Sequence, residues 1–123
     1  MRDFEGTATA RINAVPEAIF DLITDVGRLP EWNAAIEAVT EQPASLGTGA
    51  EWVVVMHPPR LPRWNSRSRV TELDRTRLRF AYRTQTDDGN PTFVTWTWDI
   101  AAAEGGAQVT VRWEATPGPS AAC

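Results

Sequence analysis

The chain has 123 residues and a mass of 13.6 kDa, which is enough for one domain, residues 1–123, and too short for two. Its composition, 42% hydrophobic and 23% charged, excludes a disordered chain. No apolar run approaches the ~18 residues of a membrane helix, and the N-terminus lacks the apolar core of a signal peptide, so we expect a cytoplasmic protein with no membrane insertion.

One strand and two short helices are expected in the first third of the chain. Residues 4–13 alternate in polarity, which predicts a half-buried strand. Pro16 suits the first turn of a helix, and Asp25-Val-Gly27 would end it. A second short helix would begin at Pro30. The side chains expected to face inward are Phe4, Gly6, Ala8, Ala10 and Ile12 on the strand, Ile19, Phe20, Leu22 and Ile23 on the first helix, and Trp32, Ala35 and Ile36 on the second.

The rest of the chain predicts six strands separated by turns. Residues rich in Gly, Pro and Asp mark breaks at 43–49, 58–59, 74–76, 87–91 and 104–106. Connections this short join antiparallel neighbours, because a parallel return needs a crossover of a dozen or more residues. The strands should therefore form a meander.

Several of these strands place apolar side chains on one shared face. Alternation is clearest in 92–100 and 108–115, and it recurs in 78–82 and in 52–56. Four of the six tryptophans fall on this face, which makes it unusually aromatic. The face would contain Trp52, Val54, Met56, Leu78, Phe80, Tyr82, Val94, Trp96, Trp98, Ile100, Val109, Val111 and Trp113.

Residues 60–83 are basic, with eight arginines and two acids, although the chain has a net charge of -4. Clustered arginines can bind nucleic-acid phosphates, but on adjacent strands they can also lie in water beside acids. The acidic chain favours the second alternative, with no nucleic-acid partner. The orientation of Arg67 and Arg69 depends on the turn near Asp74: three residues would send both outward, and four would turn both inward.

The order of these segments resembles the START-like, or SRPBCC, superfamily. The resemblance is carried by Ile12-x-Ala-x-Pro16-x-x-Ile-Phe20-x-Leu22-x-x-Asp25 and Leu29-Pro-x-Trp-Asn33. Gly47-Thr-Gly49 and Arg69-Val-Thr-Glu-Leu-Asp74 are similar to its polyketide cyclase/dehydrase branch, so residues 1–116 match and 117–123 are a short tail. The resemblance implies an α+β helix-grip fold, in which a curved seven-stranded antiparallel sheet and a long C-terminal helix enclose a hydrophobic cavity.

The chain departs from that pattern after its last expected strand. Residues 117–123 contain two prolines and a glycine and cannot form the ~20-residue helix that would span a small domain. We therefore expect the long helix to be missing and the uncovered sheet face to favour a homodimer.

The resemblance implies that the function is binding of a hydrophobic small molecule that is lipid-, sterol- or polyketide-like. The alternatives are an aromatase/cyclase-like enzyme acting by acid/base chemistry and substrate folding, and a protein-interaction module that uses the open sheet face. Candidate catalytic residues are His57, Tyr82 and Arg69. With one histidine, and Cys123 as the only cysteine, we expect no metal, no cofactor and no disulfide. The expected ligand-binding residues are Trp52, Val54, Met56, Phe80, Tyr82, Val94, Trp96, Trp98, Val111 and Trp113.

Overall fold

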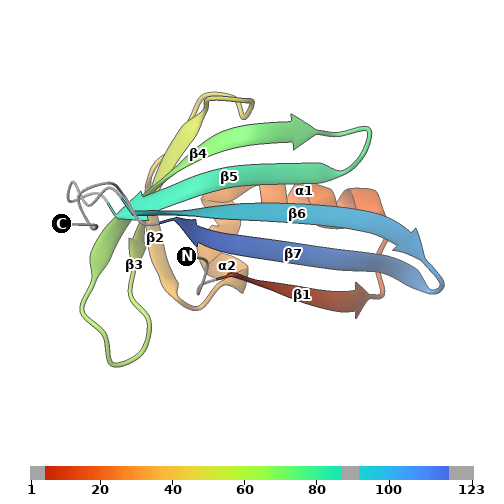
Figure 1. Cartoon of the computed structure of the whole chain (residues 1–123), viewed down its shortest axis with the longest axis horizontal. Coiled ribbons are helices and arrows are strands. Elements are labelled where there is room, and N and C mark those ends of the chain that lie inside the picture. The colour runs from red at the N-terminus through yellow and green to blue at the C-terminus, as the bar shows by residue number, and fades with distance from the viewer. Residues whose placement is uncertain (1–4, 87–91, 117–123) are drawn as a thin grey trace.

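Seven antiparallel strands form a single sheet that curves around two short helices (Figure 1). This computed structural model describes residues 5–86 and 92–116. The strands lie in the order β1-β7-β6-β5-β4-β3-β2, so the predicted meander is confirmed and β1 pairs with the last strand. In chain order the elements are β1 (Glu5–Ile12), α1 (Pro16–Thr24), the 3-10 turn η1 (Val26–Arg28), α2 (Leu29–Trp32), β2 (Ile36–Glu41), β3 (Glu51–Met56), β4 (Trp64–Asp74), β5 (Arg79–Thr86), β6 (Phe93–Ala103) and β7 (Gly106–Thr116).

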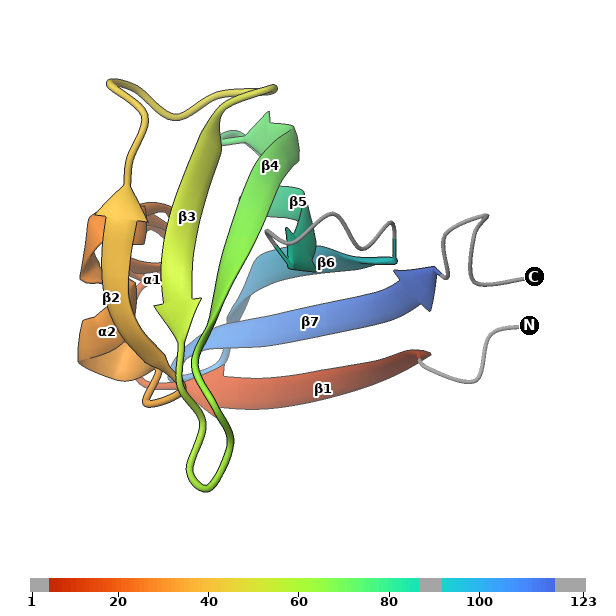
Figure 2. The same ribbon diagram turned by 90° about the vertical axis from the view of Figure 1, so that its left-hand side faces the viewer.

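The sheet is strongly twisted, and its concave face holds the core. Figure 2 shows β2 and β3 running across the direction of β7 and β1, with α1 and α2 beside β2. The helices pack against one part of the concave face, where Phe20 and Phe80 are each 1% exposed. The other core residues are Ile19, Ile23, Val26, Leu29, Ile36, Trp52, Val54, Val70, Ile100, Ala107 and Val109.

The first helix agrees with its prediction and the second does so only in part. Helix α1 begins at Pro16 and ends before Asp25, and it buries Ile19, Phe20 and Ile23, whereas Leu22 is half-buried. Helix α2 is a single turn, because the chain becomes extended at Asn33 and Ile36 already belongs to β2. Trp32 is therefore not buried as expected: it lies at the edge of the core with 37% of its surface exposed.

Strand β1 is exposed rather than half-buried. Only Gly6 has intermediate burial, and Ile12 is 42% exposed. The physical reason is that α1 and α2 cover a different part of the concave face, and that no long helix follows β7 among the described residues. Of the features expected from the sequence, Phe4, the turn at 87–91 and the tail with Cys123 lie outside the described residues.

A β-bulge decides the orientation of the β4 arginines. The turn between β4 and β5 has four residues, since Asp74 pairs with Arg79, and that length alone would turn the arginines inward. However, Thr71 is an extra residue on β4, and the pairing shifts by one between Val70 and Glu72. The bulge reverses the alternation again, so Arg67 and Arg69 face outward while Ser66, Ser68 and Val70 are buried.

The arginines of the basic segment lie among acids. Arg67 forms ion pairs with Glu41 and Glu51, at 3.2 and 3.0 Å. Further pairs join Arg63 to Glu37, Arg75 to Asp21, Arg77 to Asp74 and Arg79 to Glu72 and Asp99. Five of the eight arginines thus have a nearby carboxylate, the arrangement that favours a solvated surface over a phosphate-binding one. In the described part of the chain, no helix has the length and apolar character needed to cross a membrane.

Candidate functional site

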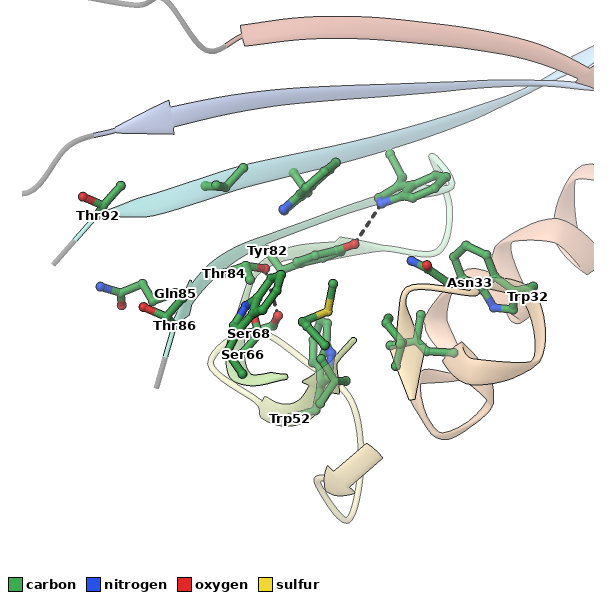
Figure 3. A pocket seen from close by; sticks show the side chains of 18 residues that line it. Trp32, Asn33, Trp52, Ser66, Ser68, Tyr82, Thr84, Gln85, Thr86 and Thr92 are labelled. Atoms are coloured by element: carbon green, nitrogen blue, oxygen red, sulfur yellow. Dashed lines mark hydrogen bonds between the residues drawn. The ribbon is translucent and has the colours of Figure 1, made fainter. Parts of the chain in front are cut away.

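A pocket of about 390 Å3 lies on the concave face between α2 and strands β2–β6, partly open to solvent (Figure 3). On the strands, mostly every second side chain lines the pocket, because successive side chains point to opposite faces of a sheet. The lining residues are Leu29, Trp32, Asn33, Ile36, Trp52, Val54, Met56, Trp64, Ser66, Ser68, Tyr82, Thr84, Gln85, Thr86, Thr92, Val94, Trp96 and Trp98.

Tryptophan is the commonest residue type in the described pocket wall. Five of the six tryptophans line it: Trp32, Trp52, Trp64, Trp96 and Trp98. Trp32 meets Trp98 edge to face, with ring centroids 6.1 Å apart. Trp52 meets Tyr82 in the same way at 5.0 Å. These contacts position large flat surfaces around one cavity, which suits a ligand with an extended apolar surface.

Serine and threonine hydroxyls on β4 and β5 line part of the pocket. Ser66 pairs with Thr86 and Ser68 with Thr84, all four on the concave side. The Ser68 and Thr84 hydroxyl oxygens are hydrogen-bonded at 2.9 Å. Ser66 and Ser68 are only 4% and 3% exposed, so these polar groups lie inside the protein although the wall around them is apolar.

Tyr82 lies at the centre of the wall, between these serine and threonine hydroxyls and α2. Its phenolic oxygen accepts a hydrogen bond from Nε1 of Trp98 at 3.1 Å. Burial raises the pKa of Tyr82 to about 12, and the bond from Trp98 lowers it by a smaller amount. The phenol is therefore protonated at neutral pH and can donate a hydrogen bond. Figure 3 shows the Asn33 side chain directed toward the same part of the pocket.

Seven of the ten expected ligand-binding residues line this pocket. They are Trp52, Val54, Met56, Tyr82, Val94, Trp96 and Trp98. Phe80 does not reach it, because it is fully buried beneath Trp52 and Tyr82. Val111 and Trp113 lie on β7, beyond the end of the pocket, where the Trp113 ring packs 6.1 Å from that of Trp96.

Two of the three candidate catalytic residues lie outside the pocket. Arg69 faces the opposite side of the sheet, where it is paired in register with Glu51 and Arg83. His57 follows β3, and its Nδ1 atom lies 3.1 Å from Oε1 of Glu37. Only Tyr82 is on the pocket wall.

The alternation in the sequence did not predict the polar lining of the pocket or two of its tryptophans, Trp32 and Trp64. Trp64, Ser66 and Ser68 alternate with Asn65, Arg67 and Arg69, so the period of two was visible in the sequence. What was missing was the register of β4, which depends on the bulge at Thr71. Trp32 and Asn33 enter the pocket because α2 is only one turn long.

The sequence matches the family described as polyketide cyclase / dehydrase and lipid transport over residues 3–122. Among curated proteins, none matches the chain significantly.

Solved structures show the same fold at low sequence identity. Protein CV1439 from Chromobacterium violaceum is 22% identical, with a TM-score of 0.75 over 92% of this chain and 80% of that one. The ginseng major latex-like protein 151 from Panax ginseng is 8% identical, with a TM-score of 0.75 over 91% of this chain and 78% of that one.

A third similar structure is a two-domain protein. It is the di-domain ARO/CYC StfQ from the steffimycin biosynthetic pathway, 14% identical, with a TM-score of 0.75. The match covers 95% of this chain and 38% of StfQ, so this chain corresponds to less than half of that protein. The family match covers nearly the whole chain, and the solved structures share its fold. The chain therefore belongs to the polyketide cyclase/dehydrase family of the SRPBCC superfamily.

Proposed function

We propose that the chain binds a hydrophobic small molecule in the concave pocket and acts as a binding or carrier protein. The observation that carries this proposal is the gathering of five tryptophans around one cavity of about 390 Å3. Ligand sites of roughly 300–1,000 Å3 with aromatic walls and a few polar groups are typical of small-molecule binding. The family description, which includes lipid transport, supports the same class of ligand.

The pocket favours a ligand with an extended apolar surface. Trp52, Trp96 and Trp98 line the cavity, and aromatic side chains of this size suit a lipid-, sterol- or polyketide-like molecule. A ligand that covered these rings would remove apolar area from water, and each 100 Å2 would contribute about 2–3 kcal/mol of gross binding energy before the costs of association.

Binding is supported better than acid/base catalysis. Among the lining residues that the structure describes, Tyr82 is the only titratable side chain, and its raised pKa keeps it protonated. His57 and Arg69 do not face the cavity. An aromatase/cyclase-like activity that used the described lining residues would therefore depend on the shape of the pocket and on hydrogen bonds, not on a general base among them.

The test is saturable binding of the uncharged fluorescent probe N-phenyl-1-naphthylamine, with energy transfer from the pocket tryptophans. We expect Val94→Phe to weaken binding about tenfold or more, because the added ring would occupy part of the cavity. The matched control is Val55→Phe on β3, since Val55 is not a lining residue. No saturable binding by the unaltered chain, or equal effects of the two variants, would contradict the proposal.

The homodimer stays a prediction. It is supported by the exposed side chains at the β1 end of the sheet, where Ile12 is 42% exposed. Sedimentation of a clean monomer at ~10 μM would count against it.

A further inference from the structure

The polar groups of the described pocket lining are uncharged. Among the eighteen lining residues within 5–86 and 92–116 there is no Asp, Glu, Lys, Arg or His, although the chain has 28 Asp, Glu, Lys and Arg residues. Arg67 and Arg69, which alternate with lining residues of β4, are turned to the other face of the strand by the bulge at Thr71. A ligand carboxylate or ammonium group beside these lining residues would lose water and gain no opposite charge from them, which is strongly unfavourable.

The same pocket offers hydrogen bonds from neutral groups. The hydroxyl row, defined here as Ser66, Ser68, Thr84 and Tyr82, contributes four hydroxyls to the lining. Each hydroxyl can donate one hydrogen bond and accept others, so it can bind a hydroxyl or a carbonyl oxygen of a ligand.

Parts of this hydrogen-bonding capacity are not used within the protein. One hydroxyl of the Ser68 and Thr84 pair donates its proton to the other, so the proton of the accepting hydroxyl is free to form another hydrogen bond. Tyr82 accepts from Trp98, which leaves its own proton for another acceptor. Ser66 is 4% exposed, its hydroxyl forms no hydrogen bond within residues 5–86 and 92–116, and its oxygen is open to the pocket rather than enclosed in the core. These hydroxyls are therefore available to bind a polar partner in the pocket.

The residues of the row follow the register of two neighbouring strands. Ser66 and Ser68, and likewise Tyr82 and Thr84, are two residues apart on β4 and β5, which separates their Cα positions along each strand by about 7 Å. Trp64 precedes Ser66 and Ser68 on the same side of β4, and Trp52, Trp96 and Trp98 come from β3 and β6 on either side. The geometry thus places hydrogen-bonding groups within an apolar aromatic wall.

We propose that the pocket selects an uncharged, oxygen-bearing apolar ligand and that the hydroxyl row binds its hydroxyl or carbonyl oxygens. This inference rests on the proposed binding function and adds a ligand class to it. It predicts that a neutral alcohol binds better than the matching hydrocarbon, because the alcohol can form hydrogen bonds. It also predicts that the matching carboxylate binds worst, because it is charged.

The experiment compares three ligands that share one ring system: 2-naphthalenemethanol, 2-methylnaphthalene and 2-naphthoate, each at about pH 7, where the carboxylate is ionised. Affinities are measured by tryptophan quenching and by displacement of N-phenyl-1-naphthylamine. One hydrogen bond to a buried hydroxyl corresponds to about a tenfold preference for the alcohol over the hydrocarbon. We expect the carboxylate to bind at least about tenfold more weakly than the alcohol.

Variants assign the preference to the hydroxyl row. Ser66→Ala and Thr84→Val should each reduce the ratio of alcohol to hydrocarbon affinity by about three- to tenfold and leave the hydrocarbon affinity nearly unchanged. Thr97→Val is the matched control, since Thr97 lies on β6 and does not line the pocket. Its ratio should equal that of the unaltered chain.

The outcomes separate this inference from the function on which it rests. Equal binding of all three ligands, or tighter binding of the carboxylate, would overturn the inference while leaving hydrophobic binding intact. A preference for the alcohol that persists in both hydroxyl-row variants would also overturn it. If neither the probe nor any of the three ligands binds, the proposed function itself fails. The comparison of ligands on the unaltered chain decides the question even if a variant does not fold.

Discussion

Trp98 donates a hydrogen bond from its indole nitrogen to the phenolic oxygen of Tyr82, over 3.1 Å. The two residues lie diagonally across neighbouring strands, since Phe80 is the partner of Trp98 in the register and Tyr82 is the partner of Trp96. The bond orients the phenol, because an oxygen that accepts from Trp98 directs its own proton elsewhere. This pair therefore links the aromatic wall of the pocket to its hydroxyl row.

Tyr82 should ionise well above the ordinary range of a tyrosine. It is the only tyrosine in the chain, so the ultraviolet absorbance of tyrosinate reports on it alone. We expect a midpoint of about 12, because burial disfavours the phenolate. Trp98→Phe should raise the pKa further by removing the bond that stabilises the phenolate, whereas Trp64→Phe should not change it. A midpoint near the usual value of ~10 would contradict this account.

The same ionisation should destabilise the fold at high pH. The pKa of Tyr82 is higher in the folded than in the unfolded chain. The neutral phenol therefore contributes to the free energy of unfolding, and this contribution is fully present below the unfolded pKa of ~10. Stability should fall as the pH rises from ~10 through the folded value, by roughly 2–3 kcal/mol in total. Urea unfolding at a series of alkaline pH values measures this loss, and Tyr82→Phe should show a smaller one.

His57 should have little influence on the pocket. Its side chain pairs with Glu37 and is absent from the lining residues. We expect His57→Ala to change probe affinity less than about twofold, and to leave turnover of a poly-β-keto mimic unchanged wherever turnover is detected. Tyr82→Phe should weaken binding of oxygen-bearing ligands by about three- to tenfold. A tenfold loss of rate in His57→Ala would place the chemistry outside the pocket.

Glu37 should titrate below the usual range of a glutamate. Arg63 Nε lies 2.9 Å from both carboxylate oxygens, and together with His57 it lowers the pKa of Glu37. A lowered folded pKa means that the stabilisation is present above the unfolded value of ~4.3 and is lost as the pH falls through the folded one. In an NMR titration of the Glu37 carboxylate, Arg63→Gln should raise the pKa, and Arg75→Gln, at a separate ion pair with Asp21, should not.

Gly6 should be required for the position of Trp113. The two residues are partners across β1 and β7, and a Cβ atom at position 6 would overlap the Trp113 ring. Gly6→Val should therefore displace the ring at a cost of about 1–3 kcal/mol. Ala8→Val, on the same face of β1 but exposed, is the control and should stay within ~0.5 kcal/mol in chemical denaturation. An unchanged unfolding curve for Gly6→Val would contradict the close packing.

Local patterns in the sequence determined most of the fold. Alternation along the strands, short turns and the proline at position 16 are effects of neighbouring residues, and they were sufficient for the seven-stranded meander and for α1. The same alternation placed Trp52, Trp96 and Trp98 on one face. A sequence contains this information because period and turn chemistry act over a few residues.

The tertiary structure alone decided which side chains share the pocket. The bulge at Thr71 turned Ser66 and Ser68 inward and Arg67 and Arg69 outward, a choice that turn length by itself would have made wrongly. The brief α2 brought Trp32 to the rim, and the pairing of His57 with Glu37 kept the only histidine outside. These outcomes depend on register and on contacts between residues far apart in the chain, which no short window of sequence contains.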